Sequence, residues 1–284
     1  MAAPMSADTL VRILKAEGLK VVEVRDWRTH NRNHKGPWGP VHGVMLHHTV
    51  TRGTQATIDL CYNGRSDLPG PLAHGVIGKD GVVYLIGNGR ANHAGAGDGD
   101  VLCAVQEGRD APVDNETDVD GNTSFYGFEC ENLGDGKDPW PEVQVASMIK
   151  ASAAICRHYG WDKDHVVGHK EFRPGKIDPR GVAFDDMDVF RNRIQVRIGT
   201  KPAVPTPVYA PFPGSSFFKL GKRSPLITEM GKALVRKGYK GYEVGPGPEF
   251  TRADIKAYAW WQRKLGYSGT AADGYPGKTS WDKL

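Results

Sequence analysis

The sequence predicts an α/β fold for a large N-terminal domain and an all-α fold for a small C-terminal domain. Short apolar strands alternate with amphipathic helical segments through residues 1–199. Five prolines fall within residues 200–216, where they remove backbone donors and favour an extended linker. Apolar residues at helical spacing return in residues 217–284. We therefore expect two domains of unequal size, joined by a proline-rich linker.

In the first half of the large domain, the sequence predicts a helix, a strand, a hairpin and two long loops. Residues 8–17 form a short amphipathic helix, residues 44–46 a buried strand, and residues 75–86 a hairpin with an Asp-Gly turn. Residues 25–43 and 95–123 are rich in glycine, which predicts long loops. Their aromatic and polar side chains are candidates to line a binding groove.

The second half of the chain continues the alternation. Residues 126–131 predict a strand, residues 141–160 a helix begun by proline and ended by glycine, and residues 166–167 a short strand. In the tail, residues 226–234 carry an apolar stripe at helical spacing. A second helix follows a capping-box-like start at residues 251–254, and a turn leads to a short last helix.

The composition is that of a globular protein. The 284 residues include 39% hydrophobic and 25% charged residues, which excludes disordered, collagen-like and coiled-coil classes. No apolar run approaches the ~18 residues of a membrane span. Asp8 and Arg12 interrupt the N-terminus before a secretory signal could form. Four cysteines without a CxxC pair indicate free, mostly buried thiols, so we expect a cytosolic protein with no membrane partner.

The net charge is small but unevenly divided. A formal charge of +4 is too mild to indicate nucleic-acid binding. Residues 217–284 hold 13 Lys and Arg against 6 Asp and Glu, a net charge of +7, which leaves −3 on the rest of the chain. The small domain alone is basic, and a basic surface suits an anionic partner.

Two histidines stand where predicted strands end. His47 follows the strand at 44–46, His169 follows the strand at 166–167, and Asp178 lies close enough in the chain to fold back beside His169. Two imidazoles and one carboxylate with an open fourth position form a catalytic zinc set. The chain has ten histidines and no HxxxH signature, so on spacing alone other triples stay open.

A family resemblance rests on four motifs in fixed order: Leu46-His47-His48-Thr49, Gly127-Phe128-Glu129, Gly168-His169 and Lys176-Ile177-Asp178-Pro179. Over most of residues 20–195 the chain resembles the zinc-dependent N-acetylmuramoyl-L-alanine amidases of the Amidase_2 type, a superfamily that includes peptidoglycan recognition proteins. The resemblance implies a central mixed β-sheet flanked by helices. It also implies a substrate in bacterial peptidoglycan, cleaved between N-acetylmuramic acid and L-alanine. With its linked tail the chain looks like an actinobacteriophage or actinobacterial endolysin, a monomer kept in the host cytoplasm until lysis.

Carried over residue by residue, the resemblance implies a metal set and two substrate contacts. His47, the first histidine of its pair, would hold one catalytic Zn²⁺ together with His169 and Asp178. His93 matches a substrate-contacting histidine of the family. His74 aligns beside a position that faces the metal in some members, so it is also expected to contact the substrate.

The resemblance also implies the catalytic groups. Glu129 matches the family's acid/base carboxylate, and Lys176 matches the residue that stabilises the tetrahedral intermediate. Ala73 stands where some members present a tyrosine, which leaves the acid/base role to Glu129. Strand alternation puts Glu131 on the same face as Glu129, so Glu131 could be mistaken for it, whereas Cys130 points to the opposite face.

Two other functions remain open on the sequence. A non-catalytic peptidoglycan-recognition protein on the same fold would need neither the metal set nor the catalytic pair. Another zinc peptidase, acting on wall stem peptides, would lack the Gly-x-Glu and Lys-x-Asp pairing. The tail resembles small three-helix peptidoglycan-binding modules through residues 260–267 and 272–281, with Trp261 and Trp281 expected in its core.

Overall fold

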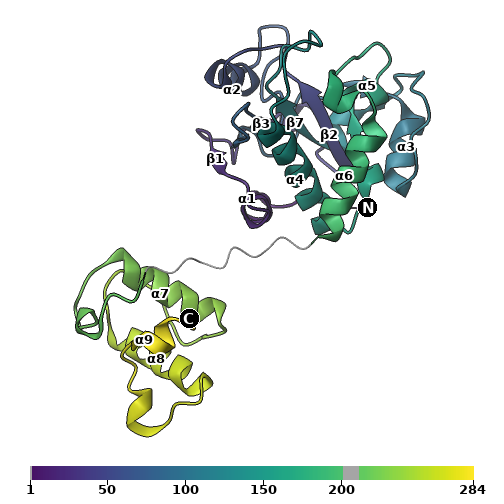
Figure 1. Ribbon diagram of the computed structural model, residues 1–284. Coiled ribbons are helices and arrows are strands. Elements are labelled where there is room, and N and C mark those ends of the chain that lie inside the picture. Colours follow the sequence, from purple (N-terminus) through teal and green to yellow (C-terminus); the bar gives the residue numbers. More distant parts are fainter. Residues whose placement is uncertain (1, 201–210) are drawn as a thin grey trace. The chain divides into compact units, whose positions relative to one another are not determined.

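The computed structural model describes residues 2–200 and 211–284 (Figure 1). The chain divides into two compact units, Met1–Pro205 and Thr206–Leu284, and the division falls inside the predicted linker. Residues 201–210 of that linker lie outside the described residues, so the domain boundaries stay a prediction. In the described part of the chain, no helix combines the length and apolar character needed to cross a membrane.

A six-stranded mixed sheet forms the centre of the first unit, in the order β1-β4-β3-β7-β2-β8. β3 and β4 pair antiparallel as the predicted hairpin, and the other neighbours pair parallel. The strands are β1 (Val21–Glu23), β2 (Gly43–His48), β3 (Gly75–Ile77), β4 (Val83–Leu85), β7 (Phe125–Cys130) and β8 (Val166–Gly168), and a separate small sheet pairs β5 (Ala96–Gly97) with β6 (Val119–Asp120). The expected mixed central sheet is confirmed.

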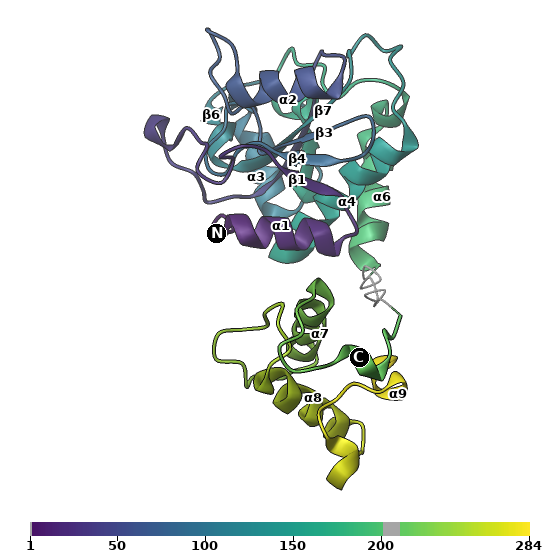
Figure 2. The same ribbon diagram turned by 90° about the vertical axis from the view of Figure 1, so that its left-hand side faces the viewer.

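Helices cover both faces of this sheet. They are α1 (Ala7–Ala16), α2 (Thr54–Asn63), α3 (Gly99–Glu107), α4 (Glu142–Tyr159), α5 (His169–Phe172) and α6 (Met187–Gly199). The main core lies between the sheet and α1, α4 and α6. Side chains of α2, α3 and α5 pack on the other face, and Figure 2 shows α1 and α2 on opposite sides of the sheet.

Helix α3 corrects the prediction of an unbroken loop at residues 95–123. Asp98 caps the start of the helix by accepting hydrogen bonds from two amides of the first turn, and Gly108 ends it in the left-handed region at φ 63°. Val101 and Val105 are buried against the sheet. The Asp and Gly residues that suggested a loop include the two caps of a helix.

The second unit has its own small core. Its α-helices are α7 (Pro225–Arg236), α8 (Arg252–Lys264) and α9 (Lys278–Trp281), in agreement with an all-α fold. The predicted capping box at Thr251 and Asp254 is present. Trp261 and Trp281 are 5% and 2% exposed, so both are core residues as expected.

Candidate active site

Three neighbouring parallel strands bring His47, Glu129 and His169 to one edge of the sheet. β2 lies between β7 and β8, and the carboxyl ends of parallel strands meet at the same edge. The register pairs His47 with Glu129 and Leu46 with Gly168, which places His169 beside His47. Alternation along β2 turns His47 away from α4, toward the face that α2 and α3 cover.

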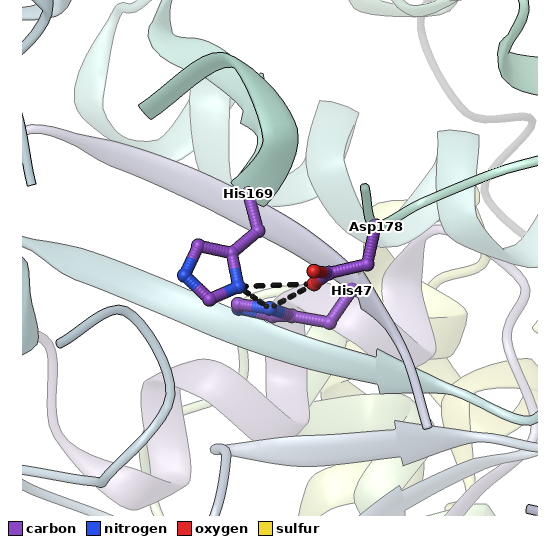
Figure 3. A group of neighbouring side chains, drawn as sticks. All are labelled: His47, His169 and Asp178. Atoms are coloured by element: carbon purple, nitrogen blue, oxygen red, sulfur yellow. Dashed lines mark hydrogen bonds and ion pairs between the residues drawn. The ribbon is translucent and has the colours of Figure 1, made fainter. Parts of the chain in front are cut away.

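The three predicted metal ligands converge on one point (Figure 3). His47 Nδ1 and His169 Nδ1 lie 3.0 Å apart, and each lies 3.0 Å from Asp178 Oδ2. All three residues are buried, and within residues 2–200 and 211–284 they are the one cluster of this kind that could hold a metal ion. Ligand atoms of tetrahedral zinc lie about 3.3–3.6 Å apart for bonds of about 2.0–2.2 Å, so the observed triangle is only a few tenths of an ångström smaller.

Hydrogen bonds on the outer side of each imidazole fix its tautomer. His169 Nε2 is 3.1 Å from the carbonyl oxygen of Ala94, which can only accept, so Nε2 carries the proton and Nδ1 keeps its lone pair. His93 Nε2 likewise donates to the carbonyl oxygen of Phe125 at 3.1 Å, which makes His93 Nδ1 an acceptor. His47 Nε2 donates to that atom at 3.2 Å, so His47 Nδ1 also keeps its lone pair.

Three acceptor atoms therefore face one another, and together they require a positive charge. Burial lowers the pKa of His47 to about 4, which disfavours a proton on this ring at neutral pH. Burial by itself would raise the pKa of Asp178, but its two histidine partners outweigh this and lower it. Two imidazole nitrogens and one carboxylate oxygen are a donor set that suits Zn²⁺. A second hydrogen bond at Nε2 of each histidine orients its ring, as is usual for metal ligands.

A pocket of about 310 Å³ opens over these atoms, and it also contains Glu129 and Lys176. Glu129 Oε2 is buried and has no hydrogen-bond partner among the described residues. Burial, and next the charge of Asp178, raise the pKa of Glu129 well above its ordinary value, whereas Lys176 acts to lower it. Lys176 itself is exposed. The two predicted catalytic groups thus share one pocket with the metal set.

Glu131 is separated from Glu129 by its contacts. Its carboxylate accepts hydrogen bonds from Gly53 N at 2.8 Å, Thr54 Oγ1 at 2.6 Å and Lys79 N at 3.2 Å. These bonds tie the end of β7 to the start of α2, where a carboxylate is favoured. Glu131 is therefore engaged in structure and does not line the pocket.

Of the two predicted substrate contacts, only one reaches the pocket. His93 lines it, although both ring nitrogens already have protein partners. His74 is fully buried, donates from Nε2 to Gly89 O and accepts at Nδ1 from Gly127 N, both at 2.9 Å. His74 is thus a core residue outside the pocket lining, and its expected contact with the substrate stays a prediction that this geometry does not support. Trp27 is 1% exposed, so it belongs to the core rather than to a groove.

Sequence reasoning missed the apolar rim of the pocket. Val50, Leu68 and Ile177 line it and are 68%, 40% and 54% exposed. No local pattern marks such residues, because the pocket draws them from three separate loops. His48 also lines the pocket and accepts a hydrogen bond from Arg180 N at 3.2 Å. Its place in the His47-His48 pair was the one available signal.

A protein family model covers much of the first unit. A family model described as N-acetylmuramoyl-L-alanine amidase matches residues 37–181. No curated protein matches the chain in a sequence comparison.

Several solved structures are similar to the chain. The endolysin N-acetylmuramoyl-L-alanine amidase LysCS from Clostridium intestinale is 19% identical over 62% of this chain and 95% of its own, with a TM-score of 0.40. A mutant endolysin from Bacillus subtilis is 19% identical over 62% of this chain and 99% of its own, with a TM-score of 0.42. The Escherichia coli N-acetylmuramyl-L-alanine amidase AmiD, in complex with a muropeptide substrate, is 15% identical over 88% of this chain and 89% of its own, with a TM-score of 0.41.

Proposed function

Because this chain belongs to the N-acetylmuramoyl-L-alanine amidase family and is an amidase of peptidoglycan, we propose that it cleaves between N-acetylmuramic acid and L-alanine with one zinc ion. His47, His169 and Asp178 would hold the ion. The observation that carries this proposal is the triangle of acceptor atoms with edges of 3.0 Å. Bound there, zinc supplies a Lewis acid that polarises the amide carbonyl and lowers the pKa of water.

Glu129 moves the proton in this proposal. Its Oε2 is buried without a partner, in the same pocket as the metal set. Burial, together with the charge of Asp178, raises the pKa of Glu129, which makes its carboxylate a stronger proton acceptor than an exposed one. Glu129 takes a proton from the attacking water and passes it to the alanine nitrogen, because an amine does not leave as an anion.

Lys176 supplies positive charge to the same pocket. Its charge reaches both Glu129 and His47, whose pKa values it acts to lower. An ammonium group in this place stabilises the negative charge that develops on the carbonyl oxygen. Val50, Leu68 and Ile177 offer apolar contacts to the methyl groups of the lactyl and alanyl units.

The test is digestion of purified cell walls by the full chain, with new amino groups and new reducing sugars measured separately. New L-alanine amino termini without reducing ends support the proposal. New amino termini elsewhere in the stem peptide indicate a zinc peptidase. No release by the zinc-loaded protein indicates a non-catalytic recognition protein.

Glu129→Gln separates catalysis from metal binding. This variant should keep one zinc ion per chain and lose activity by about 100-fold or more, since general acid–base groups contribute about 10²–10⁴-fold. Glu107→Gln is the matched control, because Glu107 is an exposed carboxylate at the end of α3. Full activity in Glu129→Gln would remove this residue from the reaction.

We further propose that residues 217–284 bind the anionic wall. Support comes from their net charge of +7. Trp261 and Trp281 are buried in the core, so charged groups on the surface would have to bind the wall. Replacing Lys219, Lys240 and Lys256, all exposed, by Glu should release the full chain from walls at low salt. Cleavage of a soluble muropeptide should not change, and unchanged wall binding would contradict the proposal.

A further inference from the structure

A single loop lies behind both histidine ligands. His47 Nε2 donates to the ring of His93, and His169 Nε2 donates to the backbone carbonyl of Ala94. These two acceptors belong to adjacent residues. Any shift of this loop therefore moves the outer partners of both imidazoles together.

The side chain of Asn122 holds that loop in place. Its Oδ1 accepts from three consecutive amides, those of His93 at 2.9 Å, Ala94 at 3.0 Å and Gly95 at 3.2 Å. Asn122 is 8% exposed and lies in a 3-10 turn at Gly121–Thr123. A hydrogen bond holds this 3-10 turn itself in place: Asn122 N donates to Asp120 Oδ1 at 3.1 Å.

Close packing leaves the loop little freedom to relax. Gly121 N donates to Gly95 O at 2.8 Å, so the two segments are also joined through their backbones. A Cβ atom at Gly127 would lie 2.5 Å from His93 Nδ1, and one at Gly121 would lie 2.8 Å from the Cβ of Ala94. The ring of His93 thus rests directly on the backbone of β7. Only glycine permits this approach.

We propose that Asn122 is a positioning residue for the metal centre: through residues 93–95 it sets the tautomer and the orientation of both histidine ligands. The inference rests on the zinc site proposed above. Partners behind metal-bound histidines typically change metal affinity by about 10–100-fold when they are removed. Asn122 acts one step further out, but on two ligands at once.

The experiment compares zinc affinity in three full-length variants. Asn122→Leu keeps the shape of the side chain and removes the acceptor, whereas Asn122→Asp keeps the acceptor. Ser147→Ala is the structural control, because Ser147 is 6% exposed and its Oγ donates to Gly81 O at 2.7 Å, beside a different turn. Zinc dissociation constants come from competition with a chromophoric chelator. The visible spectrum of the Co²⁺-loaded protein reports the ligand geometry, and thermal unfolding of the metal-free protein reports stability.

Asn122→Leu should weaken zinc binding by about 10-fold or more and alter the Co²⁺ spectrum, and Asn122→Asp should stay within about threefold of wild type. Ser147→Ala should lose stability and bind zinc normally. Wild-type affinity and spectrum in Asn122→Leu would overturn the positioning role while leaving the zinc proposal intact. A wild-type protein that binds no zinc would overturn both.

If Asn122→Leu fails to fold, two variants of His93 test the same connection. Asn at position 93 can present an amide oxygen close to where Nδ1 lies, and Leu cannot. His93→Asn should then retain most of the zinc affinity that His93→Leu loses. Equal affinity in the two variants would contradict the inference.

Discussion

Val50 combines backbone strain with a place at the mouth of the pocket. Its φ is 52°, in the left-handed region that β-branched residues avoid, and its side chain is 68% exposed. Asparagine tolerates this region, so Val50→Asn should relieve about 1–2 kcal/mol of strain. Full burial of a valine side chain stabilises a protein by about 1.5–3 kcal/mol. Only about a third of the Val50 side chain is buried, so replacing it by asparagine should cost about 0.5–1 kcal/mol. With mid-range values of about 1.5 kcal/mol gained and about 0.75 kcal/mol lost, the unfolding free energy should rise by about 0.8 kcal/mol.

Two measurements on Val50→Asn test this reasoning. The midpoint of thermal unfolding should rise by about 1–3 °C, as expected for a domain of this size. KM for a soluble muropeptide should also rise, because an apolar contact at the pocket rim is lost. Val189→Asn is the control: Val189 is 59% exposed in helix α6, so the same change there relieves no strain and should lower stability slightly. A destabilised Val50→Asn would refute the argument from strain.

Three further predictions concern the packing and the charges around the site. Gly127→Ala should weaken zinc binding by about 10-fold or more, because the new Cβ would lie 2.5 Å from His93 Nδ1. Gly160→Ala, at φ 74° with open space around it, should cost stability only. Burial lowers the pKa of His74 to about 4 from 6.5, so between these pH values the unfolded chain binds more protons than the folded chain. As the pH drops through this range, the free energy of unfolding of the metal-free protein should fall by up to about 1.4 kcal/mol per pH unit for each such histidine. Urea unfolding at several pH values measures this slope, and His74→Asn should make it shallower. Glu17, 2% exposed, pairs with two arginines from α4 and α6, so Glu17→Gln should cost about 2 kcal/mol in urea unfolding with kcat unchanged.

The strand ends of this site could be predicted from the sequence, but its hydrogen bonds could not. Apolar runs mark β2 and β8, so His47 and His169 could be predicted to lie at the ends of two strands. Their mutual distance depends on β2 pairing with β8, and no local pattern encodes that register. The tautomers depend on acceptors that lie 46 and 75 residues away in the chain. The contacts of Asn122 with residues 93–95 could not be predicted either, because an asparagine in a Gly-rich stretch usually indicates only a turn.

The helix at 99–107 illustrates a different kind of error. Its sequence is short and flanked by glycine and aspartate, the residues that both loops and helix caps favour. Burial of Val101 and Val105 against Phe125 settles the conformation, and that contact is tertiary. The burial of His74 was hidden from the sequence for a similar reason. A histidine at a strand start can face solvent or core, and only the finished sheet decides which.

The ligands of the proposed metal site are far apart in the chain but adjacent in the sheet. His47 and His169 are separated by 122 residues, and Asp178 follows nine residues later. A nascent chain that has completed β7 holds only one of the three. All three proposed ligands meet only when β8 is paired with β2, and β8 is the last strand of the sheet along the chain. If the proposed zinc site is correct, we expect a chain that ends before Asp178 to bind no zinc at this place and to leave the wall uncut.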